Sequence, residues 1–474
     1  MPKNHPTYRS LFVGLEVRTP ILDGQMIAYT NLDNAASTPA LKHVQNTVDH
    51  FLAYYSSVHR GTGFKSQLST HAFESARQQV LAFLGADPEH FICIFGKNTT
   101  EAINKLARRF PFVEGKNIVL VSAMEHHSND LPWRAVAKID HIKLLKDGQL
   151  DEADFDAKLA RYNGQVALVA ITGASNVTGF INPVHRLAEK AHAAGAEILV
   201  DCAQLAPHRQ VRMGDLDDPA HLDFVVISAH KMYAPFGSGA LVGRGEFFRH
   251  GEPDLRGGGQ VEIVTLDQVV WSEPPDREEA GSPNTIGAVA LAAAAAQLEA
   301  LGMDKIAAHE AELTAYALEQ LKTISGVRIY GNSDPYQAAE RLGVIPINLD
   351  GLSHFLVAAI LGYEFGIGVR NGCFCAHPYL LHLLGVPEKD AHSIREAILS
   401  NDRRDVPGMV RISFGLYNSK DDIDRVVEAL KTIRGGNYRG LYVQNPSTGE
   451  YTPRGWQIDF DQYFHFEPQA SMEG

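Results

Sequence analysis

A carboxylate and an amine stand thirty positions apart, each just after a short apolar segment. Residues 198–200 lead into Asp201, and residues 224–227 lead through Ser228-Ala229-His230 into Lys231. In an open parallel sheet, ligands bind outside the carboxyl ends of the strands, so both side chains would face one crevice. An ordinary ion pair explains the same two residues. The alternative is a pyridoxal 5'-phosphate (PLP) site, in which a lysine bonds to the aldehyde and an aspartate holds the pyridinium proton.

A second polar cluster, in residues 96–103, has the composition of an anion site. It follows the apolar segment 91–95 and contains Thr99 and Thr100, where we expect a helix to begin. Unpaired backbone N–H groups and the helix dipole favour a phosphate at such a position. Threonine also caps helices without any ligand, so this motif alone does not distinguish the two roles.

Two more polar side chains follow apolar segments. His126 comes after residues 117–121, and Asn176 comes after residues 166–171. A histidine there could stack on an aromatic cofactor and exchange protons near neutral pH, although a lone histidine is more often structural. Because strands that alternate with helices form a parallel sheet, all these groups should meet at one sheet edge. That convergence favours the PLP site over the ion pair.

A further set of reactive side chains lies on the loop 368–378, which is rich in Gly and Pro. It contains Arg370, Cys373, Cys375 and His377. A thiol near Arg and His has a lowered pKa and is a useful nucleophile, whereas free Cys is usually a small buried apolar residue. A metal site formed by the thiols and the histidine lacks a second ligand cluster at zinc spacing, so we expect no metal.

An arginine interrupts the short apolar segment 410–414. Arg411 is expected to be buried there. A buried guanidinium needs an anionic partner, and a substrate carboxylate would provide one through two parallel hydrogen bonds.

Composition limits the classes of protein to which the chain can belong. At 474 residues it should form two or three domains, and 45% hydrophobic with 21% charged residues is ordinary for a globular protein. The net charge of -13 opposes binding to nucleic acid or to an anionic membrane, so we expect a small-molecule partner. With only four cysteines and no signal-like or membrane-length apolar run, we expect a cytoplasmic protein without a disulfide framework.

The order of patterns predicts how the chain is organised. An Ala-rich helix from about 288 to 301 ends at Gly302, and shorter strand patterns such as 327–329 and 344–349 follow it. We expect a segment 1–29 that packs with the small domain, a large PLP-binding domain 30–302 with a mainly parallel sheet, a small α+β domain 303–435 and a C-terminal tail 436–474.

These motifs, in this order, resemble the class V PLP-dependent enzymes of the aminotransferase superfamily, in the cysteine desulfurase and selenocysteine lyase-like branch. The match covers about residues 31–430. It rests on Asn98-Thr99-Thr100-Glu101, Glu125-His126-His127-Ser128-Asn129, Ser175-Asn176-Val177-Thr178-Gly179, Asp201-Cys202-Ala203-Gln204, Ser228-Ala229-His230-Lys231, Ala280-Gly281-Ser282-Pro283-Asn284, the Cys375 loop and Arg411. The resemblance implies the α/β fold of PLP-dependent aminotransferases, fold type I.

The resemblance also implies a role for each polar side chain. Lys231 would carry PLP, Asp201 would pair with the pyridine nitrogen, and His126 would stack on the ring. Gln204 would contact the phenolic oxygen. The phosphate ligands would be Thr99, Thr100, Ser228 and His230. Ser282 would reach the phosphate of a neighbouring subunit, and the nearby His59 and Arg60 would border the same homodimer interface.

The activity that the resemblance implies is removal of sulfur from L-cysteine, with alanine and a persulfide on Cys375 as products. Asn176, Arg411 and Arg370 would bind the substrate, and a sulfur-acceptor protein would be a partner. Two alternatives remain open: a class V aminotransferase, epimerase or lyase acting on another amino acid with Cys375 uninvolved, and a PLP-bearing sulfur-relay or scaffold protein.

The Cys375 loop departs from the family pattern. Cys373 and Phe374 stand where the family commonly has histidines, and the Cys-Phe-Cys form is more similar to the loop of molybdenum-cofactor sulfurases. The segment from Cys375 to Arg411 is also longer than usual, and its charged residues 401–405 indicate a surface insertion.

Overall fold

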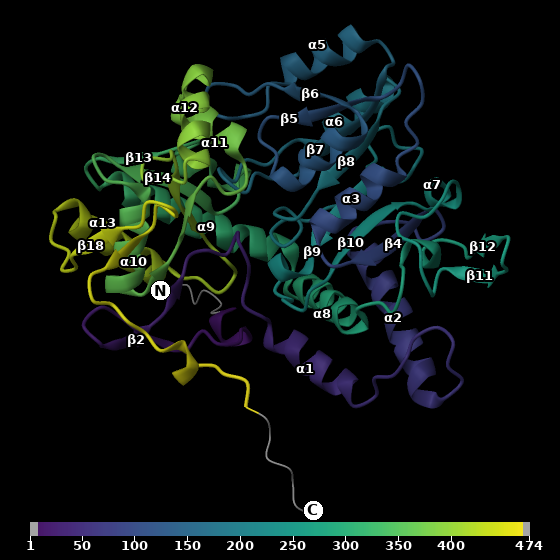
Figure 1. Ribbon diagram of the computed structural model, residues 1–474, viewed down its shortest axis with the longest axis horizontal. Helices are drawn as coiled ribbons and strands as arrows, with labels where there is room; N and C mark the ends of the chain where they lie inside the picture. The colour runs from purple at the N-terminus through teal and green to yellow at the C-terminus, as the bar shows by residue number, and fades with distance from the viewer. Residues whose placement is uncertain (1–7, 468–474) are drawn as a thin grey trace, which may run out of the picture.

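The computed structural model describes residues 8–467, and a sheet of seven strands forms its larger part (Figure 1). In spatial order the strands are β4 (Phe91–Gly96), β10 (Gly239–Arg244), β9 (Phe224–Ser228), β8 (Glu197–Asp201), β7 (Val166–Thr172), β5 (Ile118–Ser122) and β6 (Lys138–Ile142). β10 is antiparallel to both of its neighbours, and the other adjacent pairs are parallel. The expected α/β fold with a mainly parallel sheet is confirmed.

Helices cover both faces of this sheet. Along β9, Phe224 and Val226 join one hydrophobic cluster and Val225 and Ile227 join another, because successive strand side chains point to opposite faces. The first cluster includes side chains from α3 (Thr99–Arg109), α4 (Leu131–Val136) and α7 (Gly245–Arg249). The second includes side chains from α1 (Lys42–Leu52), α2 (Phe64–Phe83), α5 (Glu152–Tyr162), α6 (Val184–Ala193) and α8 (Thr285–Leu301). Burial on both faces explains why these strands are nearly continuous apolar runs.

The Ala-rich helix α8 begins earlier than the predicted residue 288. Asn284 caps it, since its side chain accepts a hydrogen bond from the backbone N–H of Gly287 at 2.9 Å. At Gly302 the chain bends by 78° into α9 (Met303–Lys322). Within residues 8–467, no single helix is both long enough and apolar enough to cross a membrane. Only the bent pair α8 and α9, taken together, has that length and apolar character.

A second, antiparallel sheet follows α9. Its spatial order is β13 (Val327–Ile329), β14 (Val344–Leu349), β17 (Met409–Ser413) and β16 (Arg370–Gly372). It shares a hydrophobic cluster with α9, α10 (His354–Phe365) and α13 (Lys420–Arg434). Between β16 and β17 lie α11 (His377–Leu384) and α12 (Glu388–Leu399), which stand above this sheet in Figure 1. The domain boundaries after residues 29, 302 and 435 remain predictions.

Segments from both ends of the chain pack beside this second sheet. The backbone N–H of Leu22 donates to the carbonyl of Tyr363 at 2.7 Å, and the carboxylate of Glu364 accepts from the backbone of Arg439 and Gly440.

Several short elements complete the described chain. The short strands are β1 (Arg18–Pro20), β2 (Met26–Ala28), β3 (Thr30–Asn31), β11 (Val261–Val264), β12 (Val269–Trp271), β15 (Ile367–Gly368), β18 (Tyr442–Gln444) and β19 (Tyr451–Pro453). The 3-10 turns lie at Tyr8–Leu11, His127–Asn129, Ala229–Lys231, Asp276–Glu278, Pro335–Glu340 and Phe460–Gln462. Residues 1–7 and 468–474 of the predicted end segments lie outside the described residues.

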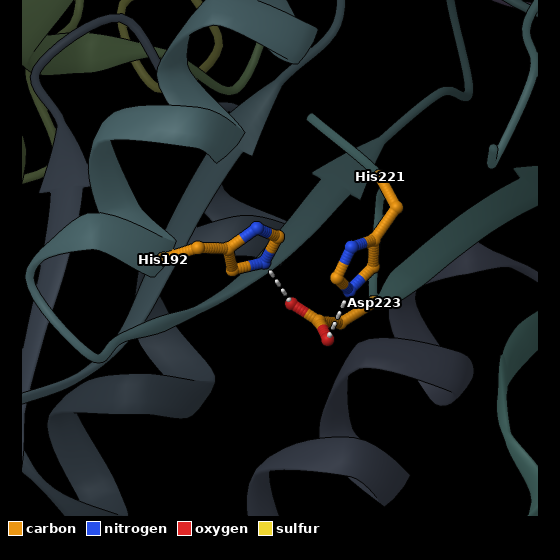
Figure 2. Close-up of side chains that lie close together, drawn as sticks. All are labelled: His192, His221 and Asp223. Carbon is orange, nitrogen blue, oxygen red and sulfur yellow. Dashed lines mark hydrogen bonds and ion pairs between the residues drawn. The ribbon is translucent and has the colours of Figure 1, made fainter. Parts of the chain in front are cut away.

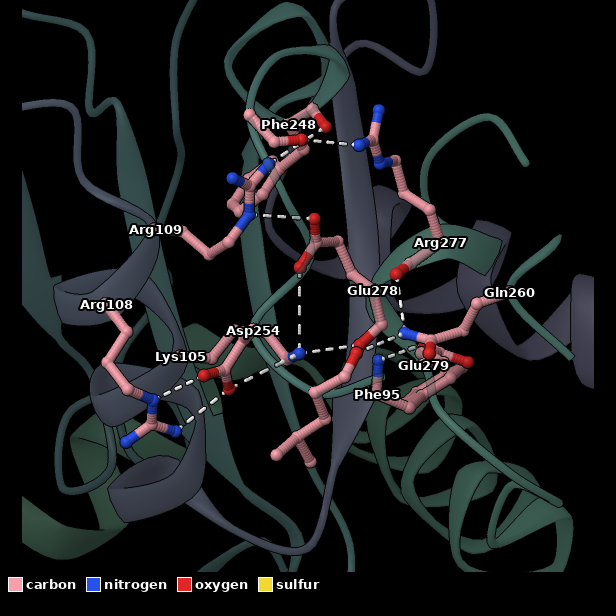
Figure 3. Close-up of polar contacts among 12 residues, drawn as sticks. Phe95, Lys105, Arg108, Arg109, Phe248, Asp254, Gln260, Arg277, Glu278 and Glu279 are labelled. Carbon is pink, nitrogen blue, oxygen red and sulfur yellow. Dashed lines mark hydrogen bonds and ion pairs between the residues drawn. The ribbon is translucent and has the colours of Figure 1, made fainter. Parts of the chain in front are cut away.

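Buried charges fix α3 against the segment 245–284 (Figure 3). The Lys105 ammonium donates to the carbonyl of Glu278 at 2.6 Å and lies 3.7 Å from its carboxylate. The Arg109 guanidinium donates to the same carboxylate at 2.9 Å. Glu278 has no exposed side-chain surface, so its charge depends on these two partners. The first turn of α3 holds the candidate anion ligands, and the network fixes the body of that helix.

Candidate active site

A cavity of about 750 Å³ opens at the carboxyl ends of the parallel strands. Every predicted site residue except Ser282 lines it: Thr99, Thr100, His126, Asn176, Asp201, Gln204, Ser228, His230, Lys231, Arg370, Cys375 and Arg411. Ser282 is exposed, as are His59 and Arg60. The structure therefore brings together the groups expected at the sheet edge and those of the Cys375 loop, although the two sets come from different sheets.

Burial moves the pKa values of the opposed acid and amine in opposite directions. Asp201 ends β8 and Lys231 ends the 3-10 turn after β9, as the apolar segments predict. Burial raises the pKa of Asp201, against a hydrogen bond of 2.9 Å from the N–H of Ala203. Burial lowers the pKa of Lys231 to about 8, although the charge of Asp201 opposes that shift. Part of the Lys231 amine is therefore uncharged near neutral pH, as a nucleophilic lysine requires.

The start of α3 and the end of β9 form a cluster of hydroxyl groups. Thr99 Oγ1 lies 2.7 Å from Ser228 Oγ, and the backbone N–H of Thr99 donates to that hydroxyl at 2.9 Å. Thr100 Oγ1 lies 2.7 Å from Ser128 Oγ. Burial lowers the pKa of the nearby His230 to about 4. Hydroxyl donors at a helix N-terminus are a donor set that fits a phosphate.

Ser128 fixes the proton position on His126. The backbone N–H of Ser128 donates to His126 Nδ1 at 3.1 Å, and Ser128 Oγ lies 2.9 Å from the same atom. Nδ1 therefore accepts, and the ring carries its proton on Nε2. Burial, followed by the charge of Lys231, lowers the pKa of His126 to about 3, so the ring is neutral. Ser128 belongs to one of the motifs that carry the resemblance, but the sequence assigns it no role, because a serine two residues after a histidine has no characteristic spacing.

Asp33 lies between two arginines that the sequence assigns to substrate binding. Arg411 donates to Asp33 Oδ1 at 3.0 Å, and a guanidinium nitrogen of Arg370 lies 3.0 Å from Oδ2. Arg411 is buried, and its Nε has no acceptor among the described residues. A carboxylate could thus bind Arg411 beside Asp33. The expectation of a buried arginine was correct, but its internal anionic partner was not foreseen.

The Cys375 loop is held in an uncommon backbone conformation. Phe374 and Cys375 have φ angles of 55° and 56°, in the left-handed region that few residues other than Gly adopt. Asn176 donates to the carbonyl of Phe374 at 2.7 Å, and His127 N–H donates to the carbonyl of Cys375 at 2.7 Å. The Arg411 guanidinium lies 4.9 Å from the centre of the Phe374 ring. These contacts from both sheets hold the loop over the cavity.

The two thiols of this loop differ in exposure. Cys375 is exposed and lines the cavity. Cys373 is half-buried, and burial raises its pKa. Cys375 is therefore the more accessible nucleophile.

The cavity is also lined by residues to which the sequence assigns no role in the site. They are His354, Phe355, Ile398, Arg403, Val406 and Pro407. Arg403 belongs to the segment 401–405, which was expected to be a surface insertion. Since its side chain lines the cavity, that segment also forms part of the site.

Comparison with known proteins places this site in a family. The model of the family described as aminotransferase class-V matches residues 30–426. A cysteine desulfurase of Dickeya dadantii is 37% identical over 422 residues, which cover 87% of this chain and 93% of the relative. A probable cysteine desulfurase of Halalkalibacterium halodurans is 36% identical over 428 residues, covering 88% and 96%.

Solved structures agree with the sequence relatives. The apo cysteine desulfurase of Thermococcus onnurineus NA1 has a TM-score of 0.75 at 33% identity, over 86% of this chain and 95% of that one. The cysteine desulfurase CsdA of Escherichia coli has a TM-score of 0.73 at 27% identity, over 91% and 98%. The chain belongs to the aminotransferase class-V family.

Proposed function

We propose that the protein is a PLP-dependent cysteine desulfurase, which removes sulfur from L-cysteine and leaves alanine and a persulfide on Cys375. The observation that carries this proposal is that an exposed thiol, Cys375, and the amine of the half-buried Lys231 line one cavity. The family depends on PLP, and the relatives described above are named cysteine desulfurases. A keto acid product in place of alanine would instead indicate an aminotransferase.

The residues of the cavity fit PLP at both of its ends. Lys231 would bond to the aldehyde of PLP. Asp201 would hold the pyridinium proton, and its burial beside Lys231 suits that role. Gln204 is buried and would face the phenolic oxygen, while its Nε2 donates to the carbonyl of Ala35 at 2.7 Å. The hydroxyl cluster at the start of α3, with His230, would hold the phosphate. His126 would stack on the ring as a neutral imidazole.

The cavity contains a side chain that could carry out each step of the reaction. Arg411 binds the substrate carboxylate, and Lys231 takes the α proton in its uncharged form. PLP supplies an electron sink beside the substrate amine when it is bound. Cys375 Sγ then bonds to the substrate sulfur while the carbon–sulfur bond breaks. The electron pair of that bond stays with the carbon fragment, which takes up a proton and becomes alanine.

A single-turnover experiment tests the role of Cys375. PLP-loaded enzyme is mixed with L-cysteine, and alanine and protein persulfide are measured for the wild type, Cys375→Ser and Cys373→Ser. We expect Cys375→Ser to form no persulfide and to lose alanine formation by on the order of 100-fold or more, because the attacking sulfur is missing. Cys373→Ser is the matched control and should stay within about threefold of the wild type. Undiminished alanine from Cys375→Ser would exclude the proposed nucleophile.

We also infer a cytoplasmic homodimer that passes sulfur to an acceptor protein. Arg60 donates to the carbonyl of Val261 at 2.8 Å, so the predicted boundary loop lies beside the hairpin β11–β12. On that hairpin Ile263 and Leu266 are 57% and 104% exposed. Apolar side chains grouped on a surface commonly mark a protein interface, and a second copy of the chain would cover them.

A further inference from the structure

Two histidines and an aspartate converge at the edge of the sheet opposite the cavity (Figure 2). His192 lies near the end of α6, and His221 and Asp223 lie just before β9. The Nε2 atoms of the histidines are 2.9 and 3.3 Å from the two carboxylate oxygens of Asp223. The rings stack with centroids 4.3 Å apart. One ligand atom from each residue lies within 4.8 Å of the others.

The hydrogen bonds of these histidines leave both Nε2 atoms without a proton in the neutral rings. His192 Nδ1 lies 2.7 Å from the carbonyl oxygen of Pro219, and His221 Nδ1 lies 2.7 Å from that of Asp218. A carbonyl oxygen can only accept, so each Nδ1 must carry the ring proton. Two nitrogen lone pairs then face the lone pairs of the Asp223 carboxylate. A positive charge is needed between them.

A metal ion would supply this positive charge better than protons on the histidine rings. Protonating both rings would place two like charges face to face at 4.3 Å, and protonating one would leave the other Nε2 lone pair against the carboxylate. A divalent ion would satisfy both nitrogens and the carboxylate together. A histidine that binds a metal through one nitrogen usually donates its other N–H to a carbonyl or carboxylate, as both rings do here.

The surroundings of Asp223 are compatible with a bound cation. Its side chain is 2% exposed, and its two carboxylate oxygens each face one of the Nε2 atoms. Arg244 also faces Asp223 at 3.3 Å, but it is paired with Glu197 as well, so one guanidinium against two carboxylates leaves a net negative charge for a cation. The side chains of His192 and His221 are 18% and 12% exposed, which leaves solvent access for a fourth ligand.

We propose that His192, His221 and Asp223 form a site for one divalent transition-metal ion of the Zn²⁺ type, with water as the fourth ligand. Two imidazoles, one carboxylate and a water form a common tetrahedral set for Zn²⁺. The ion ties the end of α6 to the loop that precedes β9. No sequence motif marks this site, since its ligands come from separate elements. Its role is structural, because the cavity lies at the other end of the same strands.

Zinc titration of PLP-loaded protein, after removal of metal by a chelator, tests the site by calorimetry. We expect a saturable site in the wild type that is weakened by on the order of 100-fold or more in His192→Gln and in His221→Gln. His185→Gln is the matched control, because His185 lies on the same helix and its Nδ1 is 2.9 Å from the carbonyl oxygen of Ala220, outside the cluster. Equal zinc affinity in the wild type and in both cluster variants, or no zinc binding by the wild type, would overturn the proposal.

Cobalt substitution separates this site from the thiols of the active site without any variant. Co²⁺ bound by imidazole and carboxylate should give tetrahedral visible bands without sulfur-to-metal charge transfer. Spectra that contain only the sulfur-dominated form would place the ion at Cys373 and Cys375 and refute the proposed site. The unfolding temperature of the wild type should also rise with added Zn²⁺, while that of the His221→Gln variant should not.

Discussion

At the scale of single residues, burial controls the chemistry of the cavity. Lys231 and His126 both lose proton affinity because their charged forms are poorly solvated, to pKa values of about 8 and about 3. Asp201 gains proton affinity for the same reason. The amine is thus prepared to act as a nucleophile and base, while the histidine stays neutral.

This shift predicts how the protein without cofactor captures PLP. Only the uncharged amine of Lys231 attacks the aldehyde, and burial depresses its pKa, so the uncharged form predominates above pH 8. The rate of capture should rise about tenfold per pH unit below that value and level off above it. Stopped-flow absorbance measures the rate at each pH. Pyridoxamine 5'-phosphate has no aldehyde and is the control. A capture rate that does not change between about pH 7 and 9 would contradict the assigned pKa.

At the scale of elements, the site depends on how α3 and the Cys375 loop are fixed. The loop is held from the larger sheet by Asn176 and from the smaller sheet by Arg411, which stacks on Phe374. Helix α3 is held at Lys105 and Arg109 by the fully buried carboxylate of Glu278 (Figure 3). Residues that line the cavity therefore fix the Cys375 loop, whereas contacts outside the cavity fix α3.

Removing the Glu278 carboxylate should destabilise the protein strongly. In Glu278→Ala the buried guanidinium of Arg109 loses its carboxylate partner, while Lys105 keeps the carboxylate of Asp254 at 3.8 Å. The unpaired guanidinium costs about 3–5 kcal/mol of unfolding free energy. Glu273→Ala is the control, because the side chain of Glu273 is 85% exposed and its ion pair with Arg249 is 3.7 Å long, so it should change stability by about 0.5 kcal/mol or less. Urea unfolding of both variants measures the difference. Equal midpoints would show that the network contributes little.

At the scale of the whole molecule, Ser282 lies outside the cavity of its own chain. The family resemblance places it at the phosphate of a neighbouring subunit. The hairpin β11–β12 points to the same neighbouring subunit, because its apolar side chains are exposed to solvent in a single chain. The proposed homodimer, with two shared sites, would account for both features.

A complementation experiment tests sharing directly. Lys231→Ala and Ser282→Asp chains, each inactive alone, are mixed so that half of the dimers contain one chain of each kind. If Ser282 acts across the interface, each mixed dimer has one intact site, and the mixture recovers about a quarter of wild-type activity. Light scattering should give twice the mass of the 51.9 kDa chain. No recovery in proven mixed dimers would mean that Ser282 acts within its own chain.

The sequence by itself determined the sheet-edge site. Strands buried on both faces are apolar runs, and polar residues at their ends must share one edge, so Asp201, Lys231, His126 and Thr99 could be placed at that edge from local pattern. The start of α8 was misplaced only because the capping role of Asn284 was overlooked.

Only the tertiary structure decided the contacts between segments far apart in the chain. The pairing of Asp33 with Arg411 spans 378 positions, and the assembly of His192 with Asp223 joins a helix end to a loop. Neither leaves a periodic signal, because side chains that meet through long-range packing need no common spacing in sequence. The sequence therefore specifies which groups are available for chemistry, whereas the packing of the two sheets determines which of them meet.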